Sequence, residues 1–148
     1  MLACEKITTL LSIGPAWHMI DEIVTVNCGE SILARKVFNA DDPILRAHFT
    51  NGNSLVPGVL LLEAAAQAAA LLETYSADNG STGEKLRLIG DVQARFSASV
   101  FPGQAVDVNV TIVERIGGVT RYRGIMSVLG KRVCSIWLMG SSLNQLRD

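Results

Sequence analysis

The dominant feature of the hydrophobic pattern is one long apolar run that lacks the alternation of a strand. From Pro57 to about Tyr75 the chain is rich in Leu and Ala, so we predict a helix there. Pro57 suits its first position, because proline fixes φ and lacks a donor that would be orphaned there. The helix is apolar nearly all round, which predicts burial on most sides. Glu63 and Gln67, one turn apart on one face, interrupt it, and a buried carboxylate is costly unless it has a partner or a task.

Strand-like patterns lie on both sides of this helix. Residues 106–112 alternate Val or Ile with Asp, Asn and Thr, the period of a strand with one solvated face. Gly117-Gly118 and Gly130-Lys131 predict hairpin turns, and residues 39–43 predict a loop that continues irregularly through His48 to Val56. The other predicted elements are a short helix over residues 5–12 and strands over residues 17–26, 32–38, 86–100, 119–129 and 133–139.

These elements predict an α+β architecture in which an antiparallel sheet wraps around one long buried central helix. Two strands precede the helix and a meander of three or four follows it, and burial of the helix on most of its surface requires the sheet to curl around it. This is the hotdog arrangement. A single sheet of this kind leaves edges and one flank of the helix open, so we expect two copies to pair edge to edge.

Composition narrows the class of protein. With 148 residues, 49% hydrophobic and 18% charged, residues 1–148 are expected to form one well-filled domain. The net charge of −1 argues against general nucleic-acid binding, which needs a basic face. Cys4, Cys28 and Cys134 are too widely spaced for a zinc or disulfide framework and are expected to be reduced, partly buried thiols. No signal peptide or membrane span is predicted, so we expect a cytoplasmic protein.

Three residues supply candidate chemistry. His48 can exchange a proton near neutral pH, and Glu63 can act as its acid partner, because a carboxyl group in apolar surroundings is easier to protonate. The backbone N–H of Gly58 at the helix start suits an oxygen that gains negative charge. Together they suit proton abstraction beside a thioester carbonyl. Each also has a purely structural interpretation: a loop histidine, a hydrogen-bonded buried glutamate and a turn glycine.

The stretch resembles the active-site segment of the (3R)-hydroxyacyl-ACP dehydratases of fatty-acid synthesis (FabZ type). Their pattern is His-Phe, a short loop, Met/Val-Pro-Gly-Val-Leu, and Glu followed four residues on by Gln. The resemblance covers essentially residues 10–140. The matching residues are His48-Phe49, Val56-Pro57-Gly58-Val59-Leu60, Glu63, Gln67, Ile20-Asp21, Ala94-Arg95-Phe96, Val100-Phe101-Pro102-Gly103 and Gly130-Lys131-Arg132-Val133-Cys134.

The resemblance implies roles for these residues. His48 would take the C2 proton, and Glu63 of the other subunit would protonate the departing 3-hydroxyl, directly or through a water. The Gly58 N–H would hold the thioester oxygen, Gln67 would orient Glu63, and Phe49 would contact the substrate. The substrate would arrive on the phosphopantetheine of acyl carrier protein, with no metal or further organic cofactor. A homodimer with sites at its interface is implied, and assembly into a higher oligomer is left open.

The chain also departs from the family pattern near the mouth of the site. Thr50-Asn51-Gly52 follows Phe49 where the family has Pro-Gly, and fifteen positions separate His48 from Glu63, one more than usual. Residues 14–18 replace the family's His-Arg-Tyr-Pro, and we predict that His18 is an ordinary strand residue. These changes suggest a specialised dehydratase on a polyketide or aryl-polyene pathway. The alternatives are a hotdog thioesterase and an inactive acyl-binding subunit.

Overall fold

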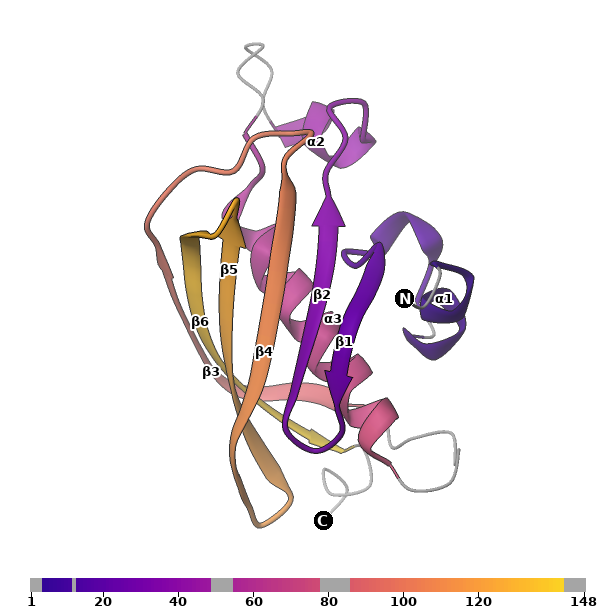
Figure 1. Ribbon diagram of the computed structural model, residues 1–148, viewed down its shortest axis with the longest axis vertical. Coiled ribbons are helices and arrows are strands. Elements are labelled where there is room, and N and C mark those ends of the chain that lie inside the picture. Colours follow the sequence, from indigo (N-terminus) through magenta and orange to yellow (C-terminus); the bar gives the residue numbers. More distant parts are fainter. Residues whose placement is uncertain (1–3, 12, 49–54, 78–85, 143–148) are drawn as a thin grey trace.

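The computed structural model describes residues 4–11, 13–48, 55–77 and 86–142 (Figure 1). Its elements in chain order are α1 (Cys4–Leu11), η1 (Pro15–Trp17), β1 (Glu22–Asn27), β2 (Ser31–Val37), α2 (Pro43–His48), α3 (Gly58–Ser76), β3 (Leu86–Phe96), β4 (Ala105–Ile116), β5 (Val119–Val128) and β6 (Lys131–Ser142). The predicted leading helix, central helix and meander are therefore confirmed, with ends that differ by a few residues.

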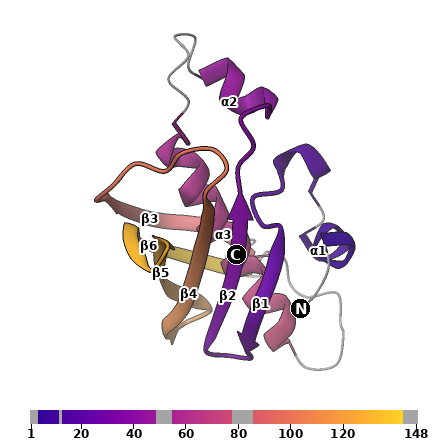
Figure 2. The same cartoon turned by 45° about the horizontal axis from the view of Figure 1, so that its top comes forward.

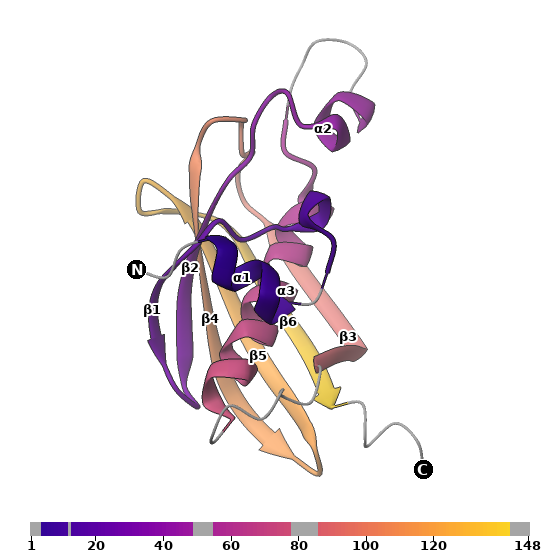
Figure 3. The ribbon, with the colours of Figure 1, turned by 90° about the vertical axis from the view of Figure 1, so that its right-hand side faces the viewer.

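The strands form one six-stranded sheet in the order β1-β2-β4-β5-β6-β3, and every neighbouring pair is antiparallel. Figure 3 shows the sheet curling around α3, with β1 and β3 on opposite sides of the helix. Val106, Val108 and Val110 of β4 are buried, as the alternation predicts. The hairpin turns place Gly117, Gly118 and Gly130 at positive φ, which glycine adopts without steric cost. The predicted α+β hotdog fold is confirmed.

Small residues let α3 approach the sheet closely. Ala64, Ala65, Ala68 and Ala69 are fully buried, together with Leu71 and Leu72. One stripe of the helix is covered less well: Val59 is 62% exposed, and Leu62, Glu63, Ala66 and Ala70 are partly exposed. The central helix is therefore buried against the sheet and open along the stripe that carries Glu63.

The first strand was predicted to start at Trp17, and that prediction is wrong. The Trp17 N–H bonds to the Gly14 carbonyl at 2.9 Å, so residues 15–17 form a 3-10 turn and β1 begins only at Glu22. Pro15 favours this turn because its φ is already fixed. His18 is buried, its Nε2 donates to the Ile13 carbonyl at 3.0 Å, and it lies outside any strand. A β-rich composition alone could not locate this turn.

The prediction that residues 39–56 are irregular is also wrong, because helix α2 lies within them. The Leu45 and Arg46 N–H groups bond to the Asp42 carbonyl at 3.0 and 3.1 Å, which starts a helix at Pro43. Leu45 is buried, whereas the rest of α2 is more exposed and stands beyond the end of β2 (Figure 2). Six residues are too few to show helical periodicity, although Asp followed by Pro is a recognised helix start.

Strand β3 has one neighbour, β6, so its other side is a free edge among the described strands. Residues 90–99 are exposed, including Val92 at 42%. Its register against β6 shifts between Leu88 and Val92, so the strand predicted over residues 86–100 contains an irregularity. The strand ends at Phe96, earlier than the predicted Val100.

A polar cluster around one buried tyrosine fastens the C-terminal end of α3 to the sheet. The hydroxyl of Tyr122, which is fully buried, donates to Glu73 of α3. Arg115 donates to the same carboxylate at 3.1 Å and to the Thr120 hydroxyl at 3.0 Å. Burial, helped by the Glu73 carboxylate, raises the pKa of Tyr122 well above its ordinary value.

Glu73→Ala is expected to lower the free energy of unfolding by about 1–3 kcal/mol, because it strands a buried hydroxyl. The double variant Glu73→Leu/Tyr122→Phe removes both partners and should unfold within about 1 kcal/mol of wild type. Urea denaturation measures both, and an equal loss in the two would contradict this account.

The raised pKa of Tyr122 also predicts a pH dependence of stability. As pH rises, Tyr122 loses its proton in the unfolded chain before it does so in the folded protein, so the free energy of unfolding of wild type should fall above about pH 10. The Tyr122→Phe variant should lack this component of the fall.

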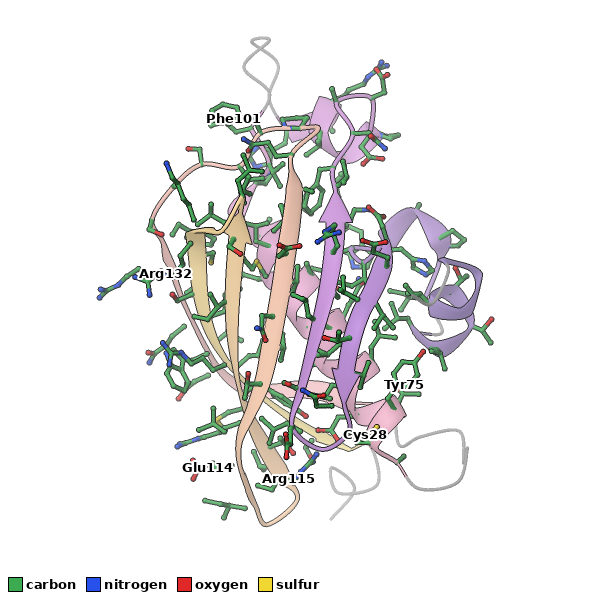
Figure 4. All side chains as sticks on the ribbon, in the orientation of Figure 1. Cys28, Tyr75, Phe101, Glu114, Arg115 and Arg132 are labelled. Carbon is green, nitrogen blue, oxygen red and sulfur yellow. The ribbon has the colours of Figure 1, made fainter. Side chains whose placement is uncertain are left out.

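The described cysteines differ in their surroundings. Cys28 is exposed, and its Sγ lies 3.2 Å from the Tyr75 carbonyl at the end of α3 (Figure 4). Cys134 is buried in β6, and burial raises the pKa of its thiol to about 11. Within the described residues no helix has the length and apolarity to cross a bilayer, and no group of three or more His, Cys, Asp or Glu side chains could hold a metal ion.

Candidate active site

The start of α3 presents a backbone donor for which the described residues supply no acceptor. Pro57 is the N-cap residue, and the Leu60 N–H bonds to its carbonyl at 3.0 Å, so Gly58 is the first residue of the helix. The sequence pattern predicted Pro57 as the first residue of the helix, whereas it is the N-cap residue just before it. The Gly58 N–H is therefore one of the first helical donors, which have no acceptor within the helix and point along its axis.

A phenylalanine ring occupies the space beside Gly58 where a side chain would stand. A Cβ built on Gly58 would lie 2.8 Å from two ring carbons of Phe96 and 3.3 Å from a third, so any larger residue would have to displace the ring. The sequence patterns gave no reason for this glycine beyond the turn. The same patterns do not predict the Phe96 contact, although Ala94-Arg95-Phe96 is part of the family resemblance.

Glu63 is held by Gln67, as their spacing of one helical turn suggested. Gln67 is only 4% exposed, and its Nε2 donates to Glu63 Oε1 at 2.9 Å. The same nitrogen donates to the Trp17 carbonyl at 2.8 Å, and Oε1 of Gln67 accepts from the Met19 N–H at 2.8 Å. Because an N–H can only donate and a carbonyl can only accept, these bonds fix which way the Gln67 amide points.

This arrangement leaves one oxygen of Glu63 uncommitted by Gln67. Oε1 can accept the Gln67 hydrogen bond whether the carboxyl group is ionised or protonated, so Oε2 can carry a proton without losing that contact. The backbone of residues 17–19 is thus a supporting part of the site. Sequence reasoning missed it because those residues were assigned to a strand.

His48 lies on a separate element. It is the exposed last residue of α2, at the end of the molecule beyond β2, whereas Gly58, Glu63 and Gln67 share the first three turns of α3 (Figures 2 and 3). Phe49 and the Thr50-Asn51-Gly52 departure lie outside the described residues. An oriented carboxyl group, a helix-start N–H and an exposed imidazole are the groups that acid–base chemistry at a carbonyl needs.

The comparisons with known proteins agree with the fold and the motifs. Residues 12–137 match the family model described as a FabA-like domain. The 3-hydroxyacyl-[acyl-carrier-protein] dehydratase FabZ of Haemophilus influenzae is 31% identical over 139 residues, covering 94% of this chain and 93% of that protein. The FabZ of Cronobacter sakazakii is 34% identical over 138 residues, covering 93% and 91%.

Among solved structures, the dehydratase heterocomplex ApeI:P from Xenorhabdus doucetiae matches with a TM-score of 0.72, covering 95% of this chain and 92% of that one. At 16% identity this match concerns the fold alone. The family model spans most of the chain, and the FabZ relatives exceed 30% identity over more than nine-tenths of it. The chain belongs to the FabA-like family.

Proposed function

We propose that the protein dehydrates (3R)-3-hydroxyacyl thioesters on acyl carrier protein to trans-2-enoyl thioesters. The observation that carries this proposal is Glu63, a carboxyl group on a mostly apolar helix, held through one oxygen by a buried Gln67 and lying five residues after the helix-start N–H of Gly58. The other oxygen, Oε2, is not held by Gln67 and is the one that would carry the transferred proton. The FabZ relatives act on the same class of substrate by name.

In the proposed reaction His48 removes a proton from C2 of the acyl chain. The electrons move toward the thioester oxygen, which the Gly58 N–H and the positive end of α3 stabilise. As the C2–C3 double bond forms, the C3–O bond breaks and Glu63 Oε2 gives its proton to the leaving hydroxyl, which departs as water. His48 ends with one proton more and Glu63 with one fewer, and return of that proton through solvent restores the site. These steps use side chains and one backbone N–H.

Two further residues have supporting roles in this proposal. Gln67 keeps Glu63 oriented, and Phe49 contacts the acyl chain beside His48. We also propose that residues 1–148 work as one domain in the cytoplasm, where acyl carrier protein would deliver the substrate on its phosphopantetheine. The changed residues around 14–18 and 50–52 favour a specialised substrate, of the polyketide or aryl-polyene kind.

We further propose that the working protein is a homodimer paired through β3, with each site built from His48 of one chain and Glu63 of the other. Two observations support this. The free edge of β3 exposes unpaired backbone groups and apolar side chains, which natural proteins normally cover. The stripe of α3 that carries Glu63 is also open in a single chain, whereas His48 is presented on α2 at the end of the molecule.

The function is tested by giving the protein a (3R)-3-hydroxyacyl thioester on carrier protein and on coenzyme A, over several chain lengths. Enoyl absorbance is the expected signal. Release of free thiol without enoyl product would instead identify a thioesterase, which could also use a carboxylate and a helix-start N–H. Binding without any turnover would identify an inactive acyl-binding subunit.

Mixing two inactive proteins tests the shared site. A heterodimer of one His48→Ala chain and one Glu63→Gln chain has one site with both changes and one site with neither. When equal amounts of the two proteins are mixed, half of all dimers are heterodimers. Activity should therefore return to about a quarter of wild type, by the symmetry of an isologous dimer.

Subunit exchange is demonstrated first with a mass tag, because an apolar interface can exchange slowly. Zero recovery after proven exchange would show that each site is built within one chain.

A further inference from the structure

Phe96 is placed against the proposed oxyanion donor in a way that the motifs did not explain. It is the last residue of β3, and although it is large and apolar it remains 49% exposed. Its ring nevertheless occupies the position where a Gly58 side chain would stand, with two ring carbons 2.8 Å from that point. The ring therefore lies directly over the first residue of α3.

The direction of this contact matters for the donor. In an α-helix the Cα–Cβ bond is tilted toward the helix N-terminus. A side chain at Gly58 would point outward with this tilt, so the ring that lies against its position borders the first turn of α3, whose N–H groups point toward the same end. An apolar ring there competes with water for the surroundings of the N–H, and a donor shielded from water interacts more strongly with a developing charge.

Backbone hydrogen bonds hold the chain next to Phe96 and next to the start of α3. Immediately after Phe96, the Ser97 N–H donates to the Val133 carbonyl at 2.9 Å. Immediately before Pro57, the Val56 N–H donates to the Val100 carbonyl at 2.9 Å. The first bond ties the end of β3 to β6, and the second ties the segment before α3 to the segment after β3. With the backbone held in this way, we expect the ring to leave Gly58 by side-chain rotation.

We propose that Phe96 is a positioning residue for the thioester: its ring forms one wall of the space in front of the Gly58 N–H, keeps water from that donor and restricts how the carbonyl oxygen can approach it. The inference rests on the proposed function and adds a residue that acts through Gly58. It also explains why Gly58 lacks a side chain, because the ring takes the place of one.

Kinetics of Phe96→Ala and Phe96→Leu test this role. For Phe96→Ala we expect kcat to fall about 10- to 100-fold, somewhat less than the 10²–10³-fold cost of losing an oxyanion donor outright, with KM changed by no more than about threefold. Leucine retains part of the wall and should give a smaller loss. Phe101→Leu is the matched control, since Phe101 is similarly exposed at 51%, and it should retain wild-type kcat (Figure 4).

A spectroscopic measurement separates positioning from a structural role. The probe is a carbonyl-¹³C saturated acyl thioester of N-acetylcysteamine, which has no 3-hydroxyl and cannot be dehydrated. Bound to wild type, its carbonyl stretch should move to lower frequency because of the Gly58 hydrogen bond. Phe96→Ala should lose about half or more of that shift, whereas Phe101→Leu should retain it.

A double variant completes the test. Gly58→Ala alone should lower kcat, because its methyl group must push the ring aside, but in a Phe96→Ala background the same substitution should cost much less. Unchanged kcat and an unchanged carbonyl shift in a folded Phe96→Ala protein would overturn the inference while leaving the proposed function intact. A wild-type protein that forms no enoyl product would instead overturn the proposed function.

Discussion

Replacing His48 by alanine is expected to lower kcat for dehydration by about 10²- to 10⁴-fold, the usual worth of general acid–base catalysis. The imidazole is exposed at the end of α2, and the described core does not include it, so the fold should survive. Alanine is also the better helix former, which favours a stable α2. Melting temperature, circular dichroism and the rate of enoyl formation together measure the effect.

Arg46→Ala is the matched control for His48→Ala. Arg46 lies on the same helix, is exposed, and within the described part of the chain forms its ion pair with the exposed Asp41, a pair of a kind that is worth little. It should retain both stability and activity. If His48→Ala retained more than about a hundredth of wild-type kcat, loss of a general base would not describe the result.

The elements predicted correctly from sequence are those whose signals are local and repeated. The run after Pro57 carries enough Leu and Ala to identify α3, and the alternation of Val106, Val108 and Val110 identifies the buried face of β4. The glycines in the turns predict hairpins because their backbone angles demand glycine. The order of the strands across the sheet was not predicted, because it depends on contacts between distant parts of the chain.

The errors fall where a short element depends on a few hydrogen bonds. Helix α2 has six residues and is set by the Asp42 carbonyl, and η1 is set by Gly14 and Pro15. Neither is long enough for hydrophobic periodicity to develop. Their misassignment also hid part of the site, because the backbone of residues 17–19 supports Gln67.

In the candidate site too, contacts between residues close in sequence could be predicted and contacts between distant residues could not. Glu63 and Gln67 are four residues apart on one helix, so their contact could be predicted from spacing alone. Phe96 and Gly58 are 38 positions apart, and their contact exists only because β3 ends beside the start of α3. The relation of His48 to Glu63 depends on a second chain in our proposal, which no pattern within one chain can place.

Glu63→Gln is expected to abolish most dehydration while leaving the helix and its packing intact. The new amide oxygen can accept the same hydrogen bond from Gln67 Nε2, so the local geometry should survive. An amide cannot give the leaving hydroxyl the proton that a carboxylic acid gives, and we expect a loss of about 10²-fold or more in kcat. Glu73→Gln, a change of the same kind ten residues along α3, should retain activity because its amide can still accept from Tyr122.

Glu63→Leu separates this catalytic role from a structural one. Replacing a partly buried ionisable group by an apolar one of similar size is often neutral or stabilising, and the Gln67 amide retains its bonds to residues 17 and 19. The melting temperature of Glu63→Leu should therefore stay close to that of wild type although activity is lost, because removal of the partly buried charge offsets the one Gln67 N–H that loses its acceptor. A large fall in melting temperature would mean that Glu63 is a satisfied structural carboxylate, and the acid in the proposed reaction would have to be sought elsewhere.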